Sequence, residues 1–212
     1  MKRILSFIIG ITFIFASSKE GDIGFRYGFL TQPSYDSDSL TVLSDSSIIH
    51  TGDFLKINIG YKNKTNFCIA YRDADGGYMS LYSSDDDKDS NQDISYVTAL
   101  HWAKMMPPSG IETFYFINSA ESLSDLKTVL GRYQDAPPKG KSKLAVRIQD
   151  KINSYDPDVQ DDLSSISSVL DKPVEGGVTF RGEDDGLKDL SLTHECFGTD
   201  GIAFKKIVLI HK

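Results

Sequence analysis

Apolar and polar side chains alternate along the middle of the chain, and the alternation is regular enough to predict strands. Residues 54–61 show it most clearly, with apolar side chains at every second position: Leu55, Ile57, Ile59 and Tyr61. A period of two residues places these side chains on one face of a pleated strand. Runs rich in aromatic and β-branched residues predict four more strands, at 67–72, 78–82, 94–102 and 112–117. Asp75-Gly76 lies between two of these runs and predicts a tight antiparallel hairpin.

The spacing of apolar residues changes to a helical period after residue 117. Five apolar side chains recur every three or four positions: Leu123, Leu126, Val129, Leu130 and Tyr133. They predict an amphipathic helix. Asn118 is in a position to cap this helix, with Glu121 in the answering position of a capping box.

Two further helices are expected in the carboxyl-terminal half of the chain. Residues 134–143 contain Pro137 and Pro138 and predict a loop. Beyond this loop, apolar residues at positions 144, 148 and 152 predict a second helix. Asp156 and Pro157 suit the cap and first turn of a third helix, which ends before Pro173.

The two ends of the pattern complete the expected fold. Residues 19–47 show little periodicity and predict an extended lead-in with one or two short strands. Residues 178–181 predict a short strand, and the apolar run at 202–211 predicts a strand inserted beside earlier ones. We therefore expect an α+β fold, an antiparallel β-sandwich-like sheet with a packed helical hairpin. It forms one domain over residues 48–212, with a helical insertion at about 143–172.

The first eighteen residues have the pattern of an export signal peptide. A basic head at Met1-Lys2-Arg3 precedes an apolar run at 4–15 and the small residues Ala16-Ser17-Ser18. The run of about twelve residues is shorter than the ~20 that span a bilayer. We therefore expect cleavage after residue 18, a mature chain without a transmembrane span, and a periplasmic or extracellular location. An uncleaved membrane anchor is the alternative.

Composition and charge narrow the possible partners. The chain is 40% hydrophobic and 25% charged, which is ordinary for a globular protein. Its formal net charge of −7 gives a surface that repels phosphate backbones, so nucleic acid is not an expected partner. The sequence contains only two cysteines, Cys68 and Cys196. In an oxidising compartment one disulfide between them is expected, and two separately buried thiols are the alternative.

Acidic residues gather in two places that suggest a weak metal site. Asp73 and Asp75 flank the predicted hairpin turn, and Asp85 and Asp87 lie in the polar segment that follows it. Carboxylates are ligands for Ca²⁺, but the spacing does not fit an EF-hand loop. We favour a solvated acidic loop and expect no cofactor. Glu112 is a further site candidate if its carboxylate is buried.

The four histidines offer no recognisable zinc spacing or adjacent nucleophile: His50, His101, His194 and His211. Aromatic side chains are numerous in the predicted sheet and suit either the core or a face that binds a peptide or sugar chain. A Met-Met-Pro-Pro loop adds a flexible docking candidate. The candidate binding residues are Tyr71, Tyr78, Tyr82, Trp102 and Met105.

Several short motifs occur in the order found in one bacterial domain family. They are Thr51-Gly52-Asp53, the Asp-x-Asp-Gly turn at 73–76, Leu81-Tyr82, and Pro108-Ser109-Gly110-Ile111-Glu112. Over residues of about 48–133 the chain resembles the DUF4384 family, whose function is unknown. Its members are β-rich accessory modules, often attached to caspase-like peptidase or protein kinase domains. The helical segment from Lys143 to Lys172 departs from that family's short core.

The resemblance implies a module without catalytic residues. We therefore expect an exported, non-catalytic binding or assembly module that engages a protein or an envelope component. Two alternatives remain open: a secreted hydrolase that uses loop carboxylates, and a calcium-dependent adhesion module.

Overall fold

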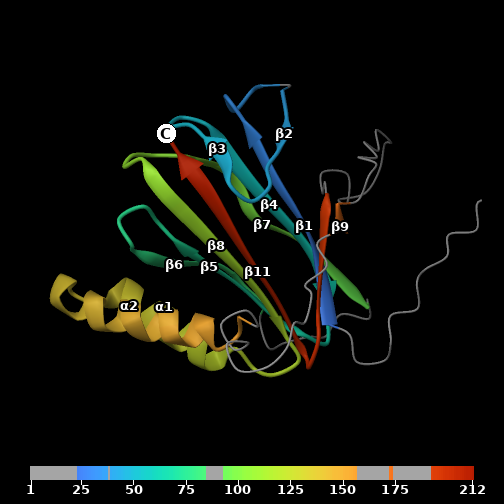
Figure 1. Cartoon of the computed structure of the whole chain (residues 1–212), viewed down its shortest axis with the longest axis vertical. Coiled ribbons are helices and arrows are strands. Elements are labelled where there is room, and N and C mark those ends of the chain that lie inside the picture. Colours follow the sequence, from blue (N-terminus) through green and yellow to red (C-terminus); the bar gives the residue numbers. More distant parts are fainter. Residues whose placement is uncertain (1–22, 38, 85–92, 157–171, 174–191) are drawn as a thin grey trace, which may run out of the picture.

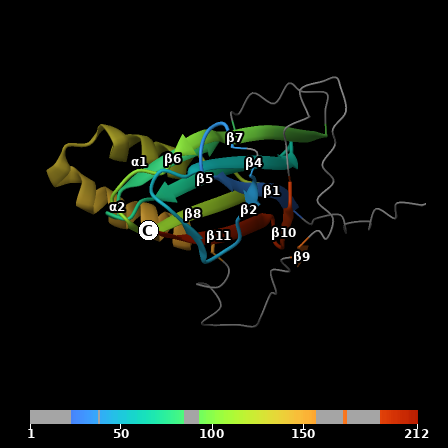
Figure 2. The ribbon, with the colours of Figure 1, turned by 90° about the horizontal axis from the view of Figure 1, so that it is seen from above.

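Two antiparallel β-sheets pack face to face, and a pair of helices covers the outer face of one of them (Figures 1 and 2). The computed structural model describes residues 23–37, 39–84, 93–156, 172–173 and 192–212. Within these residues the fold is a β-sandwich with an added helical layer, which confirms the expected α+β class.

The first sheet, sheet A, has β1 near its centre. Its strands run in the order β7 (Ile94–Lys104), β4 (Phe54–Lys62), β1 (Ile23–Gln32), β10 (His194–Gly198) and β9 (Lys172–Pro173), and β2 (Thr41–Val42) pairs beside β1. The sequence predicted one or two short strands before residue 48, whereas β1 is ten residues long and pairs with both β4 and β10. Phe25, Tyr27 and Phe29 of β1 are buried between the sheets, so the fold begins well before residue 48.

The second sheet, sheet B, contains most of the strands that were expected from the alternation. Its order is β3 (Ser47–Ile49), β11 (Ile202–His211), β8 (Gly110–Ser119), β5 (Asn66–Arg72) and β6 (Tyr78–Ser83). Neighbouring strands are antiparallel except for the parallel pair of β3 and β11. The strand expected at 202–211 is confirmed, because β11 pairs with β8 over ten residues from each strand.

Sheet B is buried on both faces, which divides the core into two layers. Phe114 and Phe116 of β8 face sheet A and belong to the inner layer. Tyr115 and Ile117 alternate with them and face the helices in the outer layer. Since both faces of sheet B are covered, β8 has no exposed position over residues 112–119.

The helical hairpin is present, but its boundaries differ from those expected. Helix α1 (Ser124–Asp135) begins six residues after Asn118, which lies in β8 and donates a hydrogen bond to the carbonyl of Gly24 instead of capping the helix. Helix α2 (Pro138–Asn153) begins inside the segment expected to be a loop, because Pro138 occupies the first turn, where proline needs no partner for its nitrogen. The third helix and the strand at 178–181 lie outside the described residues.

The expected disulfide is absent, because the two cysteines lie on opposite sides of sheet B. Cys68 of β5 is buried in the outer layer against the helices. Cys196 of β10 is buried in the inner layer, where its thiol lies 3.5 Å from the carbonyl oxygen of Phe204. A free cysteine packs well as a small apolar side chain, so the alternative of two separately buried thiols is the one that the structure contains.

We predict that both thiols are present and unreactive in the folded chain. Burial raises the pKa of the Cys68 thiol to about 12, so almost none of the nucleophilic thiolate exists at pH 8. Iodoacetamide at pH 8 should leave the native protein unmodified and add two carbamidomethyl groups after unfolding in guanidinium without reductant. Mass spectrometry measures the additions. A protein that gains no group after unfolding contains the disulfide and contradicts this arrangement.

Candidate functional site

A cavity of about 360 Å³ opens at one end of the sandwich, between the two sheets. Its walls are mainly apolar. Leu55 and Leu100 contribute from sheet A, and Leu81 and Phe114 contribute from sheet B. Cavities of this size with apolar walls and a few polar groups are typical of ligand-binding sites, so this end of the sandwich is the candidate functional site.

Methionines gather at this cavity. Met79, Met105 and Met106 all line it, and they are the only methionines in the described part of the chain. Met106 is 63% exposed and Met79 is 46% exposed, whereas Met105 is buried beneath them. Unbranched, polarisable thioether side chains adapt to apolar surfaces of different shapes. The entrance of the cavity is therefore suited to an adaptable apolar contact.

Two turns position the cavity wall. The hairpin between β5 and β6 has Gly76 at a φ of +82°, and Asp73 accepts a 2.6 Å hydrogen bond from the backbone N–H of Gly77. This confirms the expected Asp-Gly hairpin. The loop after β7 crosses close to that turn, since a Cβ atom at Gly110 would lie 2.8 Å from the Cβ of Ala74. Glycine at position 110 therefore allows the two turns to meet at the cavity.

Irregular pairing of β7 with β4 turns additional side chains toward the cavity. Leu55 pairs with Ala103 and Ile57 pairs with Leu100, so β7 has one more residue than β4 between these pairs. Such a β-bulge interrupts the strict alternation of faces. As a result both Leu100 and Ala103, three residues apart on one strand, line the same cavity.

A chain of buried hydrogen bonds extends from the cavity into sheet B. The Tyr71 hydroxyl donates to Glu112 Oε2 at 2.5 Å, and Glu112 Oε1 lies 3.1 Å from His211 Nδ1. His211 Nε2 in turn lies 2.9 Å from the hydroxyl oxygen of Thr51. Glu112 and His211 are each 2% exposed, so their polar atoms form hydrogen bonds with each other instead of with water.

The strand register explains why these residues meet. Tyr71, Glu112 and His211 lie on the neighbouring strands β5, β8 and β11, and all three face the inner side of sheet B. A carboxylate can only accept hydrogen bonds, so His211 donates from Nδ1. Burial, followed by the hydrogen bond to Glu112, raises the pKa of the Tyr71 hydroxyl, which therefore stays protonated and donates. The network joins three strands at the cavity.

Two of the five candidate binding residues line this cavity, Tyr71 and Met105. The other three lie elsewhere in the structure. Tyr78 faces α2 and donates a 2.6 Å hydrogen bond to Gln149 Oε1. Tyr82 lies 2.7 Å, oxygen to oxygen, from the Tyr61 hydroxyl. Trp102 lies on the other face of β7, where the ammonium group of Lys56 is 5.5 Å from the centre of its ring.

The candidate metal ligands do not converge where the structure describes them. Asp73 lines the cavity and Asp75 lies in the adjacent turn, whereas Asp85 and Asp87 are outside the described residues. Over residues 23–37, 39–84, 93–156 and 192–212, no group of three His, Cys, Asp or Glu side chains could hold a metal ion. The histidines are also separate: His194 stacks on Tyr27, and only His211 joins the buried network.

Sequence reasoning identified Glu112 as a candidate but missed its partner. Glu112 and His211 are 99 positions apart, and only the pairing of β8 with β11 brings them together. Met79 was also missed as a site residue. It lies in the strand that follows the Asp-Gly turn and pairs with residues 67–72. Methionine is scarce in this sequence, and the residues at 79, 105 and 106 could have been considered together as candidates for one binding surface.

Comparison of the chain with known protein families, curated proteins and solved structures finds no match. The resemblance to the DUF4384 family therefore stays a prediction.

We predict that Glu112 stabilises the fold. Glu112→Gln removes the charge of this acceptor and turns an NH2 donor toward Tyr71 or His211, so both buried hydrogen bonds become neutral and one partner must accept instead of donate. The free energy of unfolding should fall by about 1–3 kcal/mol, and Tyr71→Phe should lower it by about 0.5–1.5 kcal/mol. Urea denaturation measures both. If Glu112→Gln leaves the free energy of unfolding unchanged, the hydrogen-bond network does not stabilise the fold.

Proposed function

We propose that this chain is a non-catalytic binding module that receives an apolar side chain of a partner protein in the methionine-lined cavity. The cavity itself carries the proposal, because it combines a volume of about 360 Å³ with apolar walls and exposed methionines. Interfaces commonly draw most of their binding energy from a few large side chains inserted into such pockets. Asp73 and Lys104 at the same cavity supply charges that can orient the inserted segment.

The proposed setting is the cell envelope. The basic head and short apolar run of residues 1–18 support export to the periplasm or the cell exterior. In the described residues no helix is long and apolar enough to cross a bilayer. A net charge of −7 favours a protein or an uncharged envelope component over nucleic acid as the partner.

A hydrolase is the second candidate, and one specific observation favours it. Thr51, His211 and Glu112 are hydrogen-bonded in the order of nucleophile, base and orienting acid, and Thr51 is exposed. Acyl transfer also needs free donors for the developing oxyanion. The nearby backbone N–H groups are already used: Thr51 donates to Lys212 and Gly52 donates to Met105. Binding is therefore the better-supported function.

We predict that a photo-crosslinking residue at the cavity entrance captures the partner. Benzoylphenylalanine at position 106 should give a specific adduct in cells that produce the chain, and Ala103→Phe should abolish the adduct by filling the cavity. Position 146 on α2 is the matched control, because Val146 is 61% exposed and Met106 is 63% exposed. Electrophoresis and mass spectrometry measure the adducts. Equal adducts from 106 and 146, or an adduct that survives Ala103→Phe, contradict the proposal.

We also predict that the Thr51 hydroxyl is not a nucleophile. A fluorophosphonate probe should not label the protein, and p-nitrophenyl acetate should be hydrolysed equally by the unchanged chain and by Thr51→Val. Thr51→Val keeps the shape of the side chain and removes only the hydroxyl. Labelling of Thr51, or a slower reaction in the variant, would establish the hydrolase instead.

A further inference from the structure

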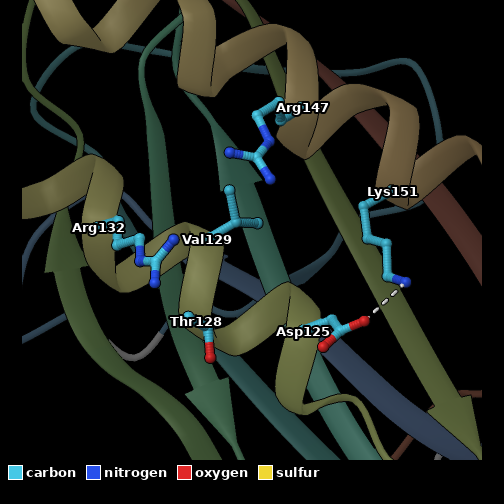
Figure 3. A pocket seen from close by; sticks show the side chains of 6 residues that line it. All are labelled: Asp125, Thr128, Val129, Arg132, Arg147 and Lys151. Atoms are coloured by element: carbon cyan, nitrogen blue, oxygen red, sulfur yellow. Dashed lines mark hydrogen bonds and ion pairs between the residues drawn. The ribbon is translucent and has the colours of Figure 1, made fainter.

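A groove with a volume of about 420 Å³ runs between α1 and α2 (Figure 3). Six residues line it: Asp125, Thr128, Val129, Arg132, Arg147 and Lys151. None of them lines the methionine-lined cavity, so the groove is a separate site. The helices are antiparallel here, since Lys151 near the end of α2 meets Asp125 near the start of α1 at 3.3 Å.

Two guanidinium groups in the groove are not paired with the one acid described among its lining residues. Arg132 extends from α1 and Arg147 extends from α2, and both point into the space above Val129 (Figure 3). The only interaction drawn among the six lining side chains joins Lys151 to Asp125. Both arginines are exposed. The two like charges therefore face one groove from opposite walls, and the single acid that the structure describes in its lining, Asp125, is paired with Lys151.

The helical layer is basic within an acidic protein. Residues 124–153 contain seven Lys and Arg residues and three Asp residues, whereas the whole chain has a formal net charge of −7. Such segregation of charge creates a positive local potential that attracts anionic partners and repels other acidic surfaces. The groove lies within this basic layer, and two arginines of the layer line it.

We propose that the groove binds an acidic peptide segment of a partner protein. The planar guanidinium groups of Arg132 and Arg147 can each form paired hydrogen bonds with a carboxylate. Val129 between them provides an apolar contact, and the Thr128 hydroxyl can bond to a peptide main chain. A segment with acidic residues on both sides of an apolar one matches these features.

An anionic membrane surface matches the groove less well. A flat surface cannot enter a groove between two helices, and it would also face the acidic side chains of the same layer. Asp125 has an 80% exposed side chain, and Asp135 and Asp150 are exposed as well. A peptide can place its carboxylates at the arginines and avoid these positions.

Fluorescence anisotropy of the full mature chain tests the proposal with a labelled peptide of repeated Glu-Leu-Glu units. The matched control peptide has Gln in place of Glu. The acidic peptide should bind, binding should weaken as NaCl rises from 50 to 200 mM, and the Gln peptide should bind at least tenfold more weakly.

Charge-matched variants locate the site. Arg132→Gln with Arg147→Gln should weaken binding of the acidic peptide at least tenfold. Lys139→Gln with Lys143→Gln removes the same charge from exposed positions of α2 outside the groove and should change binding less than twofold. Thermal melting of both double variants checks that the fold is intact.

Three outcomes overturn the proposal: no preference for Glu over Gln, equal weakening by the two double variants, or arginine-dependent binding only to phosphatidylglycerol vesicles. None of these outcomes affects the methionine-lined cavity, because Ala103→Phe and the groove variants alter different residues.

Discussion

The antiparallel pairing of β8 with β11 places residues 110–119 beside residues 202–211 in the middle of sheet B. Loop-closure entropy opposes bringing together segments so distant in sequence, and burial of both faces of the paired strands offsets that cost. Phe114, Phe116 and Ile207 are buried toward sheet A, and Tyr115 and Ile117 are buried toward the helices. Both core layers therefore depend on this one pairing.

A sheet buried on both faces restricts the polar groups that it can hold. Glu112 and His211 satisfy each other across the β8–β11 pair, and Tyr71 and Thr51 extend the hydrogen bonds to the cavity and to an exposed turn. At the other end of β8, Asn118 donates to the Gly24 carbonyl and thereby joins the two sheets. The hydrogen bonds of these polar side chains thus link neighbouring strands and sheets, although the buried Oδ1 atom of Asn118 has no hydrogen-bond partner among the described residues.

Local patterns predicted the strands and α1, because these elements present a regular apolar face. The residue types of β4 alternate from Leu55 to Tyr61, although all seven positions are buried, and Leu126, Leu130 and Tyr133 of α1 are buried at helical spacing. Strand β1 was missed although Ile23, Phe25, Tyr27 and Phe29 also occupy every second position, because the glycines between them have a low strand propensity.

The candidate site was less predictable than the fold, since its residues meet only through tertiary structure. Tyr71 and Met105 were identified from residue type alone, but Tyr78, Tyr82 and Trp102 share that type and lie elsewhere. The disulfide was wrongly predicted for a related reason. An oxidising compartment and the presence of only two cysteines favour a disulfide. The faces on which their strands present them place Cys68 and Cys196 on opposite sides of sheet B.

Strand β6 packs against the helical layer with one face and lines the methionine-lined cavity with the other. Consecutive side chains on a strand point to opposite faces, so Tyr78 bonds to Gln149 of α2 while Met79 lines the cavity. The pairing of β6 with β5 is itself irregular between Ile69 and Ala70. The edge strand therefore contacts the helical layer through Tyr78 and the methionine-lined cavity through Met79.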